Sequence, residues 1–313
     1  MIIANSDSGR LPRVIGRYGG KGNFAKDYEK YIRDIADAND CNTFVDFFGG
    51  GGTMCMLALR MRDLSTNKYL FSKVIYNDID KSMTSLFRTV KDPDTCCKLV
   101  EMLLMTPYSR EMYDKAHERI NAIREGTMKA SDLVTAYYAF VESRMSFNSA
   151  CQSYRKNEAY ENEGIGVNFE KVFQKRALEL LDMPQLLQRL VIREGSYIDL
   201  IHDNAKGELF DYNRSVLFFD CPYYQPERAA EVVYKDEMGD LEHVVLIQAL
   251  SQLKHWMLCG YQSGNVQGWQ SRVYGVLDCF KDIRKVDLGM KHRPSGSRKA
   301  EADDPHEILW IRK

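Results

Sequence analysis

The sequence predicts an α/β fold, in which an open sheet is covered by helices. Short apolar runs at residues 43–48, 73–78 and 216–219 have the length and composition of buried strands. Helical patterns alternate with such runs, as at residues 54–61 and 243–253, and this alternation is typical of an α/β sheet. Each of the three runs also ends on glycine or a carboxylate, and open α/β sheets bind ligands at the carboxyl ends of their strands.

The strand at residues 216–219 ends in the most informative stretch of the chain, Asp220-Cys221-Pro222-Tyr223. Pro222 stiffens the turn and leaves carbonyls available as acceptors. The Asp220 carboxylate and a neighbouring carbonyl therefore form an acceptor pair beside an aromatic plane, which suits a flat ring carrying an amino group. The alternative is an ordinary strand end with an Asx-type turn and a packed tyrosine, and this stretch by itself leaves both readings open.

Two further strand ends carry candidate ligand groups. The strand at residues 43–48 runs into four glycines and then a helix at residues 54–61. Glycines allow a ligand to lie against the backbone, and a helix N-terminus offers N–H groups. The next strand ends at Asp78, where an acid holds ribose hydroxyls in nucleotide-binding folds. Strand, glycine turn, helix, strand and acid, in this order, indicate a nucleotide-type site.

A glycine-rich stretch at residues 17–22 precedes an amphipathic helix predicted over residues 25–38. Lys21 within it is suited to a carboxylate or phosphate, although a flexible turn explains the pattern equally well. It is not a triphosphate-binding loop, because Gly22 follows the lysine and Ile15 stands where the first glycine is required.

The segment from residue 81 to residue 184 interrupts the alternation of strands and helices. Helical periodicity covers residues 94–104, 109–125 and 130–147, and a polar stretch with basic, amide and aromatic side chains follows. Such side chains suit contacts to base edges and phosphates, so residues 146–167 are interpreted as a ribbon that enters the major groove. The alternative is a solvated surface insertion.

The remainder of the chain returns to the α/β pattern. Residues 225–240 read as a loop able to close over a bound base, residues 256–259 as a strand, and residues 307–311 as the strand that closes the sheet. The loop at residues 291–299 carries four cations and suggests phosphate contact, with a mobile surface loop as the alternative.

Composition and residue spacing argue against a membrane span, a signal peptide, a disulfide framework and a metal site. With 313 residues and 44% hydrophobic residues, the chain fits one large or two modest globular domains. No run of eighteen apolar residues is present, and the first 22 residues lack the profile of a signal peptide. The eight cysteines include no C-x-x-C and the six histidines no paired spacing, so we expect a reduced cytoplasmic protein without a metal. The net charge of −1 leaves nucleic-acid binding to local patches.

Taken together and in order, these motifs resemble the Dam-type, N6-adenine-specific DNA methyltransferases. The similar elements span nearly the whole chain. They are Arg17-Tyr18-Gly19-Gly20-Lys21, Val45-Asp46-Phe47-Phe48-Gly49-Gly50-Gly51, Asn77-Asp78-Ile79-Asp80, Phe147-Asn148-Ser149 with Arg155 and Asn157, Asp220-Cys221-Pro222-Tyr223, and Glu307-Ile308-Leu309.

The resemblance implies a Rossmann-like S-adenosylmethionine-dependent methyltransferase sheet with helices on both faces. Residues 1–80 and 185–313 would form the catalytic domain, and residues 81–184 an inserted, mostly helical target-recognition domain with a β-hairpin. The implied reaction moves a methyl group from S-adenosylmethionine to the N6 of a flipped adenine in double-stranded DNA.

The resemblance also implies three groups of site residues. The catalytic group is Asp220, Cys221, Pro222 and Tyr223. The cofactor-binding group is Arg17, Tyr18, Lys21, Asp46, Phe48, Gly49, Gly51, Asp78, Ser196, Tyr197 and Asp220. The DNA-binding group is Asn148, Arg155, Lys156, Asn157, Lys291, Arg293 and Arg298.

Three positions depart from the family pattern. Arg17 stands where an aromatic residue is usual, Cys221 replaces the first proline of D-P-P-Y, and Ser196 replaces an acid before Tyr197. The carbonyl of residue 221 survives the change, whereas Ser196 can form a hydrogen bond but carries no charge.

The expected setting is a monomer in the cytoplasm of a bacterial or phage-infected cell, associated with the nucleoid, with a cognate restriction endonuclease as a candidate partner. The alternatives are the same pocket acting on cytosine N4, on RNA adenine or on a protein amide, and a homologue that binds DNA but has lost methyl transfer.

Overall fold

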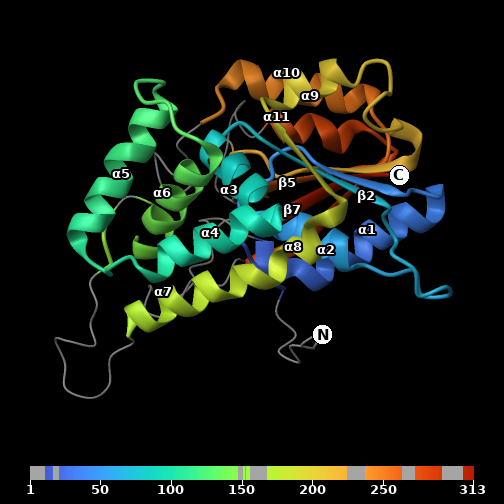
Figure 1. The fold of residues 1–313 in the computed structure, drawn as a ribbon. Helices are drawn as coiled ribbons and strands as arrows, with labels where there is room; N and C mark the ends of the chain where they lie inside the picture. Colours follow the sequence, from blue (N-terminus) through green and yellow to red (C-terminus); the bar gives the residue numbers. More distant parts are fainter. Residues whose placement is uncertain are drawn as a thin grey trace.

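The computed structural model describes residues 11–16, 21–146, 151, 153–155, 168–223, 237–262, 272–290 and 306–313. Within them the chain forms one mixed sheet of seven strands in the order β3-β2-β1-β4-β5-β7-β6 (Figure 1). The strands are β1 Thr43–Asp46, β2 Lys73–Asp78, β3 Leu190–Glu194, β4 Ser215–Phe219, β5 Trp256–Gln262, β6 Ile283–Met290 and β7 His306–Arg312.

The first five strands of that order are parallel, and β7 runs antiparallel to both β5 and β6. The strand predicted at residues 307–311 is confirmed as β7, but the expectation that it closes the sheet is wrong. β6, in which Arg284, Lys285 and Asp287 interrupt the apolar residues, gave no strand prediction; it pairs with the outer side of β7 and forms the edge. β3, at the other edge, is only partly buried, and its apolar run is limited to Leu190, Val191 and Ile192 before Arg193 and Glu194.

Helices cover both faces of the sheet, because the buried central strands send alternate side chains to opposite sides. Phe44, Phe218 and Met257 lie in one apolar core, while Val45, Leu217 and Leu258 lie in the other. The first core is shared with α1 Ala25–Asn39 and α2 Thr53–Arg60; the second is shared with α9 Tyr197–Asp203, α10 Asp240–Gln252 and α11 Arg272–Gly275 (Figure 1).

A run of helices joins β2 to β3. They are α3 Lys81–Lys91, α4 Pro93–Leu104, α5 Arg110–Arg124, α6 Asp132–Met145, α7 Phe169–Leu178 and α8 Met183–Leu186. The three helices predicted at residues 94–104, 109–125 and 130–147 are confirmed as α4, α5 and α6. The side chains of Asp92, Ser109 and Ser131 cap their N-termini, which explains why each begins where it does.

This helical segment is connected to the sheet through α3. α3 contacts β2, β3 and α6, and the buried apolar residues of α3 to α7 belong to the same apolar core as Phe44 and Phe218. α3 escaped prediction because its buried face includes Ser82, Thr84 and Ser85, which blur the apolar periodicity.

None of the helices in the described part of the chain is both long enough and apolar enough to cross a membrane.

Candidate catalytic site

The predicted carboxylates meet at one edge of the sheet. Asp46 and Asp78 are the last residues of β1 and β2, and Asp220 directly follows β4. Because β1 pairs with both β2 and β4 in parallel, the carboxyl ends of all three strands point the same way. The open-sheet rule places ligands at this edge, and the candidate site lies there.

The glycine turn between β1 and α2 approaches β2 closely. Gly49 donates its N–H to the Asn77 carbonyl at 2.7 Å, and Gly50 donates to Asp78 Oδ2 at 2.6 Å. A Cβ on Gly49 would lie 2.2 Å from the Tyr76 ring. Gly50 and Gly52 have φ values of +49° and +72°, a region that side chains disfavour. Close approach and backbone conformation therefore both require glycine here.

Asp78 is held by backbone groups on two sides. Its Oδ2 accepts from Gly50, and its Oδ1 accepts the Asp80 N–H at 2.8 Å. The neighbouring Asn77 amide donates to the carbonyls of Phe47 and Gly195 at 3.1 and 3.0 Å. The ends of β1, β2 and β3 are thus locked together around one carboxylate.

Asp46 is a buried carboxyl group beside the turn. Its oxygens accept the Phe48 N–H at 3.3 Å and the Cys55 thiol at 3.6 Å. Burial, and secondly the negative charge of Asp220, raises the pKa of Asp46 to about 8. At neutral pH Asp46 is therefore largely protonated until a cation reaches it.

Asp220 stands at the rim of the site with Lys21 against it. The Lys21 Nζ lies 3.0 Å from Asp220 Oδ1 and 2.8 Å from Glu307 Oε1. Lys21 is 3% exposed and Glu307 fully buried, whereas 22% of the Asp220 side chain reaches solvent. One ammonium thus bridges a buried carboxylate and a partly open one.

Tyr223 lies beneath that ammonium. The Lys21 Nζ is 4.4 Å from the centre of the Tyr223 ring and also contacts its hydroxyl. The hydroxyl donates to Glu307 Oε1 at 2.7 Å, and Tyr28 of α1 donates to the same oxygen at 2.9 Å. Burial, and then the charges of Asp220 and Glu307, keep the pKa of Tyr223 well above its usual value, so it stays neutral.

Cys221 points away from this cluster, into the second core. Its sulfur lies 3.4 Å from the Tyr274 hydroxyl, which lies 2.6 Å from His243 Nδ1. Burial raises the pKa of the Cys221 thiol to about 12, so it is no nucleophile. Any contribution of residue 221 to the site comes from its backbone.

Ser196 and Tyr197 begin α9 beside the Asp78 turn. The Ser196 hydroxyl accepts the Asp199 N–H at 3.1 Å and donates to the Asp199 carboxylate at 2.8 Å. The buried Tyr197 ring packs against Phe48 with centroids 5.4 Å apart, and its hydroxyl donates to the Glu242 carbonyl at 2.8 Å. Ser196 thus serves as the cap of α9 where the family pattern has an acid.

Several predicted residues lie outside the described part of the chain. They are Arg17, Tyr18, Asn148, Lys156, Asn157, Lys291, Arg293 and Arg298, together with most of the expected ribbon and of the loops at residues 225–240 and 291–299. The base of the ribbon segment is described. Ser146 and Tyr154 form an antiparallel bridge, and the Arg155 guanidinium lies 4.2 Å from the centre of the Phe169 ring.

Sequence reasoning missed the roles of Glu307, Tyr28 and Asn77. Glu307 and Tyr28 complete the cluster around Lys21, and Asn77 fixes the turn around Asp78. A glutamate at the start of a predicted buried strand was the available signal for Glu307, because such a charge needs a partner.

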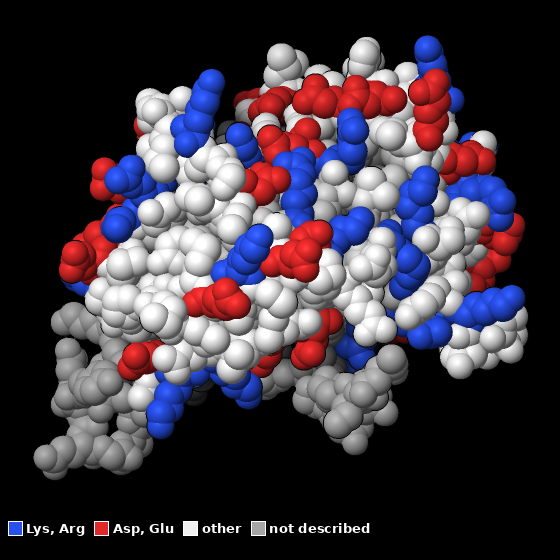
Figure 2. All heavy atoms as spheres, viewed as in Figure 1, with Lys and Arg blue, Asp and Glu red and all other residues white. Residues whose placement is uncertain are grey.

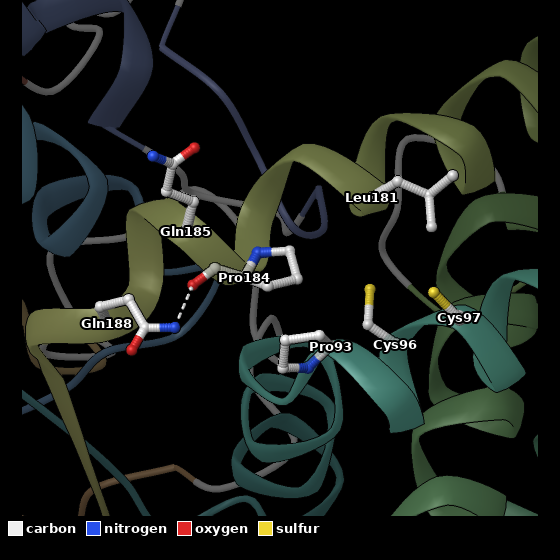
Figure 3. Close-up of a pocket in the computed structure, with 7 residues that line it drawn as sticks. All are labelled: Pro93, Cys96, Cys97, Leu181, Pro184, Gln185 and Gln188. Carbon is white, nitrogen blue, oxygen red and sulfur yellow. Dashed lines mark hydrogen bonds between the residues drawn. The ribbon is translucent and has the colours of Figure 1, made fainter. Parts of the chain in front are cut away.

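A separate surface pocket of about 320 Å³ lies between α4 and α8 (Figure 3). It is next to the amino end of β3, at the edge of the sheet opposite the carboxylates. Its lining is mainly apolar and contains no predicted site residue: Pro93, Cys96, Cys97, Leu181, Pro184, Gln185 and Gln188. It does not belong to the candidate site.

Comparison with protein families adds one finding. Residues 18–269 match the model of the family described as D12 class N6 adenine-specific DNA methyltransferase. The matched residues include Lys21, Asp46, Asp78 and Asp220. The mixed α/β sheet is consistent with a methyltransferase fold. A comparison with curated proteins returned no match.

Proposed function

The chain belongs to the D12 class N6 adenine-specific DNA methyltransferase family, and from this premise we propose that Asp220 and its neighbours hold the target adenine by its exocyclic amine. The enzyme methylates the N6 atom of adenine in DNA. The observation that carries the proposal is the Asp220 carboxylate, 22% exposed at the carboxyl end of β4 and backed by Lys21, Tyr223 and Glu307.

The amine needs activation because its lone pair is delocalised into the adenine ring. The Asp220 carboxylate and the Cys221 carbonyl accept its two N–H groups, which localises the lone pair and orients it. Asp220 Oδ1 is bound by the Lys21 ammonium at 3.0 Å, so Lys21 shifts toward Glu307 and Tyr223 as the amine binds. The amine gives up one proton during or after methyl transfer, and the partly exposed Asp220 carboxylate accepts it and passes it to solvent.

A duplex hides this amine in a base pair, so the adenine is flipped into the site. Tyr223, three residues after Asp220, is proposed to stack on the flipped base. Stacking of a base on an aromatic side chain contributes roughly 1–3 kcal/mol. The loop at residues 225–240 is proposed to cover the flipped base.

The residues around the glycine turn fit S-adenosylmethionine, which when bound supplies the electrophilic methyl group. Asp78 offers a carboxylate to the ribose hydroxyls, with Gly50 and Asp80 fixing its orientation. Lys21 and Asp46 hold the methionine end together with the glycine turn, and Asp46 offers its carboxylate to the ammonium there. Phe48, Gly49, Gly51, Ser196, Tyr197, Arg17 and Tyr18 complete the proposed donor site.

DNA binding is assigned to residues 81–184, with the catalytic domain formed by residues 1–80 and 185–313. Support comes from Arg155, which follows the Ser146–Tyr154 bridge at the base of the expected ribbon and precedes Lys156 and Asn157 in the sequence. Asn148, Lys291, Arg293 and Arg298 are the other proposed DNA contacts. Within the same hypothesis the enzyme acts as a monomer, either alone, beside a companion restriction endonuclease, or in a phage.

The first test is Asp220→Ala. We expect methyl transfer to be abolished while the melting temperature stays near that of the wild type, because Asp220 lies at the rim and not in a core. Transfer of radiolabel from the donor to duplex DNA, followed by digestion to nucleosides, gives both rate and product.

Asp203→Ala is the matched control, since it removes an exposed acid whose partners, Arg193 and His202, lie at the surface. Full activity of Asp220→Ala would remove Asp220 from the mechanism. A product other than N6-methyladenine would contradict the assigned target atom.

A further inference from the structure

Arg124, the last residue of α5, binds the acid that follows the proposed ribose site. Its Nη2 lies 2.9 Å from Asp80 Oδ2, and its Nε donates to Asp80 Oδ1 at 3.3 Å. The same Nη2 donates to the Ser82 hydroxyl at 2.9 Å. This two-point contact is the geometry in which a guanidinium fixes a carboxylate most firmly.

Asp80 connects this contact to the donor site. Its N–H donates to Asp78 Oδ1 at 2.8 Å, while its own Oδ1 accepts the N–H of Ser82 at 2.9 Å and so caps α3. The Asp80 side chain is 1% exposed. If the Asp80 carboxylate moves, the Asp80 N–H that orients Asp78 therefore moves with it.

Arg124 is itself held by α6. Glu142 Oε2 lies 3.7 Å from Arg124 Nη1, and Glu142 Oε1 lies 2.7 Å from His117 Nδ1. The Asn121 amide lies 3.1 Å from His117 Nε2. The carboxylates of Asp80 and Glu142 are almost fully buried, and the guanidinium lies between them, hydrogen-bonded to Asp80 and in ion-pair range of Glu142.

We propose that Arg124 is a positioning residue for the methyl donor. Through Asp80 it sets the N–H group that aims the Asp78 carboxylate at the ribose, so helices of the segment assigned to DNA binding complete the donor site. The inference rests on the proposed role of Asp78. It does not place Arg124 in contact with donor, DNA or the reacting atoms.

The test compares donor affinity with turnover in Arg124→Gln. We expect the Kd for S-adenosylmethionine, measured by calorimetry, to rise on the order of tenfold, because misplaced binding groups lose affinity steeply. At saturating donor the kcat should stay near the wild-type value, since no contact to the adenine changes. Arg119→Gln is the matched control, because Arg119 lies exposed on the same helix.

Asp80→Asn provides a second variant, which keeps the backbone N–H and the cap but removes the charge. It should raise the donor Kd in the same direction, and the double variant should be no worse than the poorer single variant, because both act through one contact. Additive effects, or an unchanged donor Kd in soluble, folded Arg124→Gln, would overturn the inference. So would an unchanged donor Kd in Asp80→Asn if Arg124→Gln does not fold.

Asp78→Ala separates this inference from the function on which it rests. An unchanged donor Kd in Asp78→Ala removes the ribose role itself, and with it the inference. Weakened binding in Asp78→Ala together with wild-type binding in Arg124→Gln overturns the Arg124 role alone.

Discussion

Lys21 brings one positive charge into a corner that holds two carboxylates. Glu307 is fully buried, and its negative charge is tolerated there because Lys21 and two tyrosine hydroxyls surround it. Asp220 shares the same ammonium from the solvent side. An arriving amine therefore competes for Asp220 alone, while Glu307 and Tyr223 retain the lysine. The corner can exchange one partner of Asp220 for another without exposing a buried charge.

Asp46 predicts a pH dependence of donor binding. Its pKa is raised to about 8, so near pH 6.5 the free enzyme holds a proton there. An ammonium bound to Asp46 favours the carboxylate, so donor binding at pH 6.5 should release close to one proton. The donor amine, with an ordinary α-amino pKa of about 8, is itself still charged at that pH.

Calorimetry at pH 6.5 in buffers of different ionisation enthalpy measures this release, which should fall to near zero in Asp46→Asn. Equal release by both proteins would contradict the assignment of Asp46 to the ammonium.

The raised pKa of Asp46 also makes the stability of the fold depend on pH. A raised carboxyl pKa stabilises the fold below the ordinary pKa of 3.8, and this contribution is lost as the pH rises to about 8.

At the scale of elements, the site depends on how tightly the β1–α2 turn lies against β2. The Tyr76 hydroxyl donates to the Gly50 carbonyl at 2.8 Å, and its ring packs on Phe87 of α3 with centroids 4.4 Å apart. The ring is thus fixed at both ends, directly beside Gly49. The turn therefore cannot move away from Asp78, so the Gly50 N–H stays hydrogen-bonded to the Asp78 carboxylate.

Gly49→Ala tests this packing. The added methyl group overlaps the fixed Tyr76 ring, so the free energy of unfolding should fall by about 1–3 kcal/mol, the usual range for overpacking. Denaturant unfolding measures it. Tyr76→Leu in the same chain should restore part of the loss.

Gly275→Ala is the control for this substitution. No atom lies within 4 Å of its added Cβ and its φ is −59°, so stability should be unchanged or slightly higher. A Gly49→Ala protein as stable as the wild type would show that the turn can yield.

At the scale of the whole molecule, acidic side chains are concentrated over two of the helices. Figure 2 shows Asp and Glu side chains gathered along the top, over α9 and α10, whereas elsewhere on this face Lys and Arg lie among acidic residues. Asp199, Asp203, Asp240 and Glu242 belong to these two helices. Phosphates are repelled by such a surface, so we expect DNA to approach from the side of the segment at residues 81–184.

Neutralising Arg155 and Lys156 tests that direction of approach. The double variant Arg155→Gln/Lys156→Gln should bind duplex DNA more weakly. Its log Kd should also depend less steeply on log salt, by about one unit per lost phosphate contact. Fluorescence anisotropy over a series of salt concentrations measures both effects.

Lys206→Gln is the control for DNA binding, because Lys206 is exposed between α9 and β4, at the amino edge of the sheet. An unaltered salt slope in the double variant would mean that this segment does not touch the DNA backbone.

The sequence alone determined the strands that carry Asp46, Asp78 and Asp220, and the helices α1, α2, α4, α5, α6 and α10. The spacing of apolar residues and the residue types that follow each strand involve only neighbouring positions, so they can be recognised in the sequence. It was silent on the edge strands β3 and β6, whose residues are only partly buried. Only the tertiary structure decided that Lys21 meets Glu307 and that Arg124 meets Asp80, because each contact joins residues far apart in sequence and depends on how strands and helices are ordered in space.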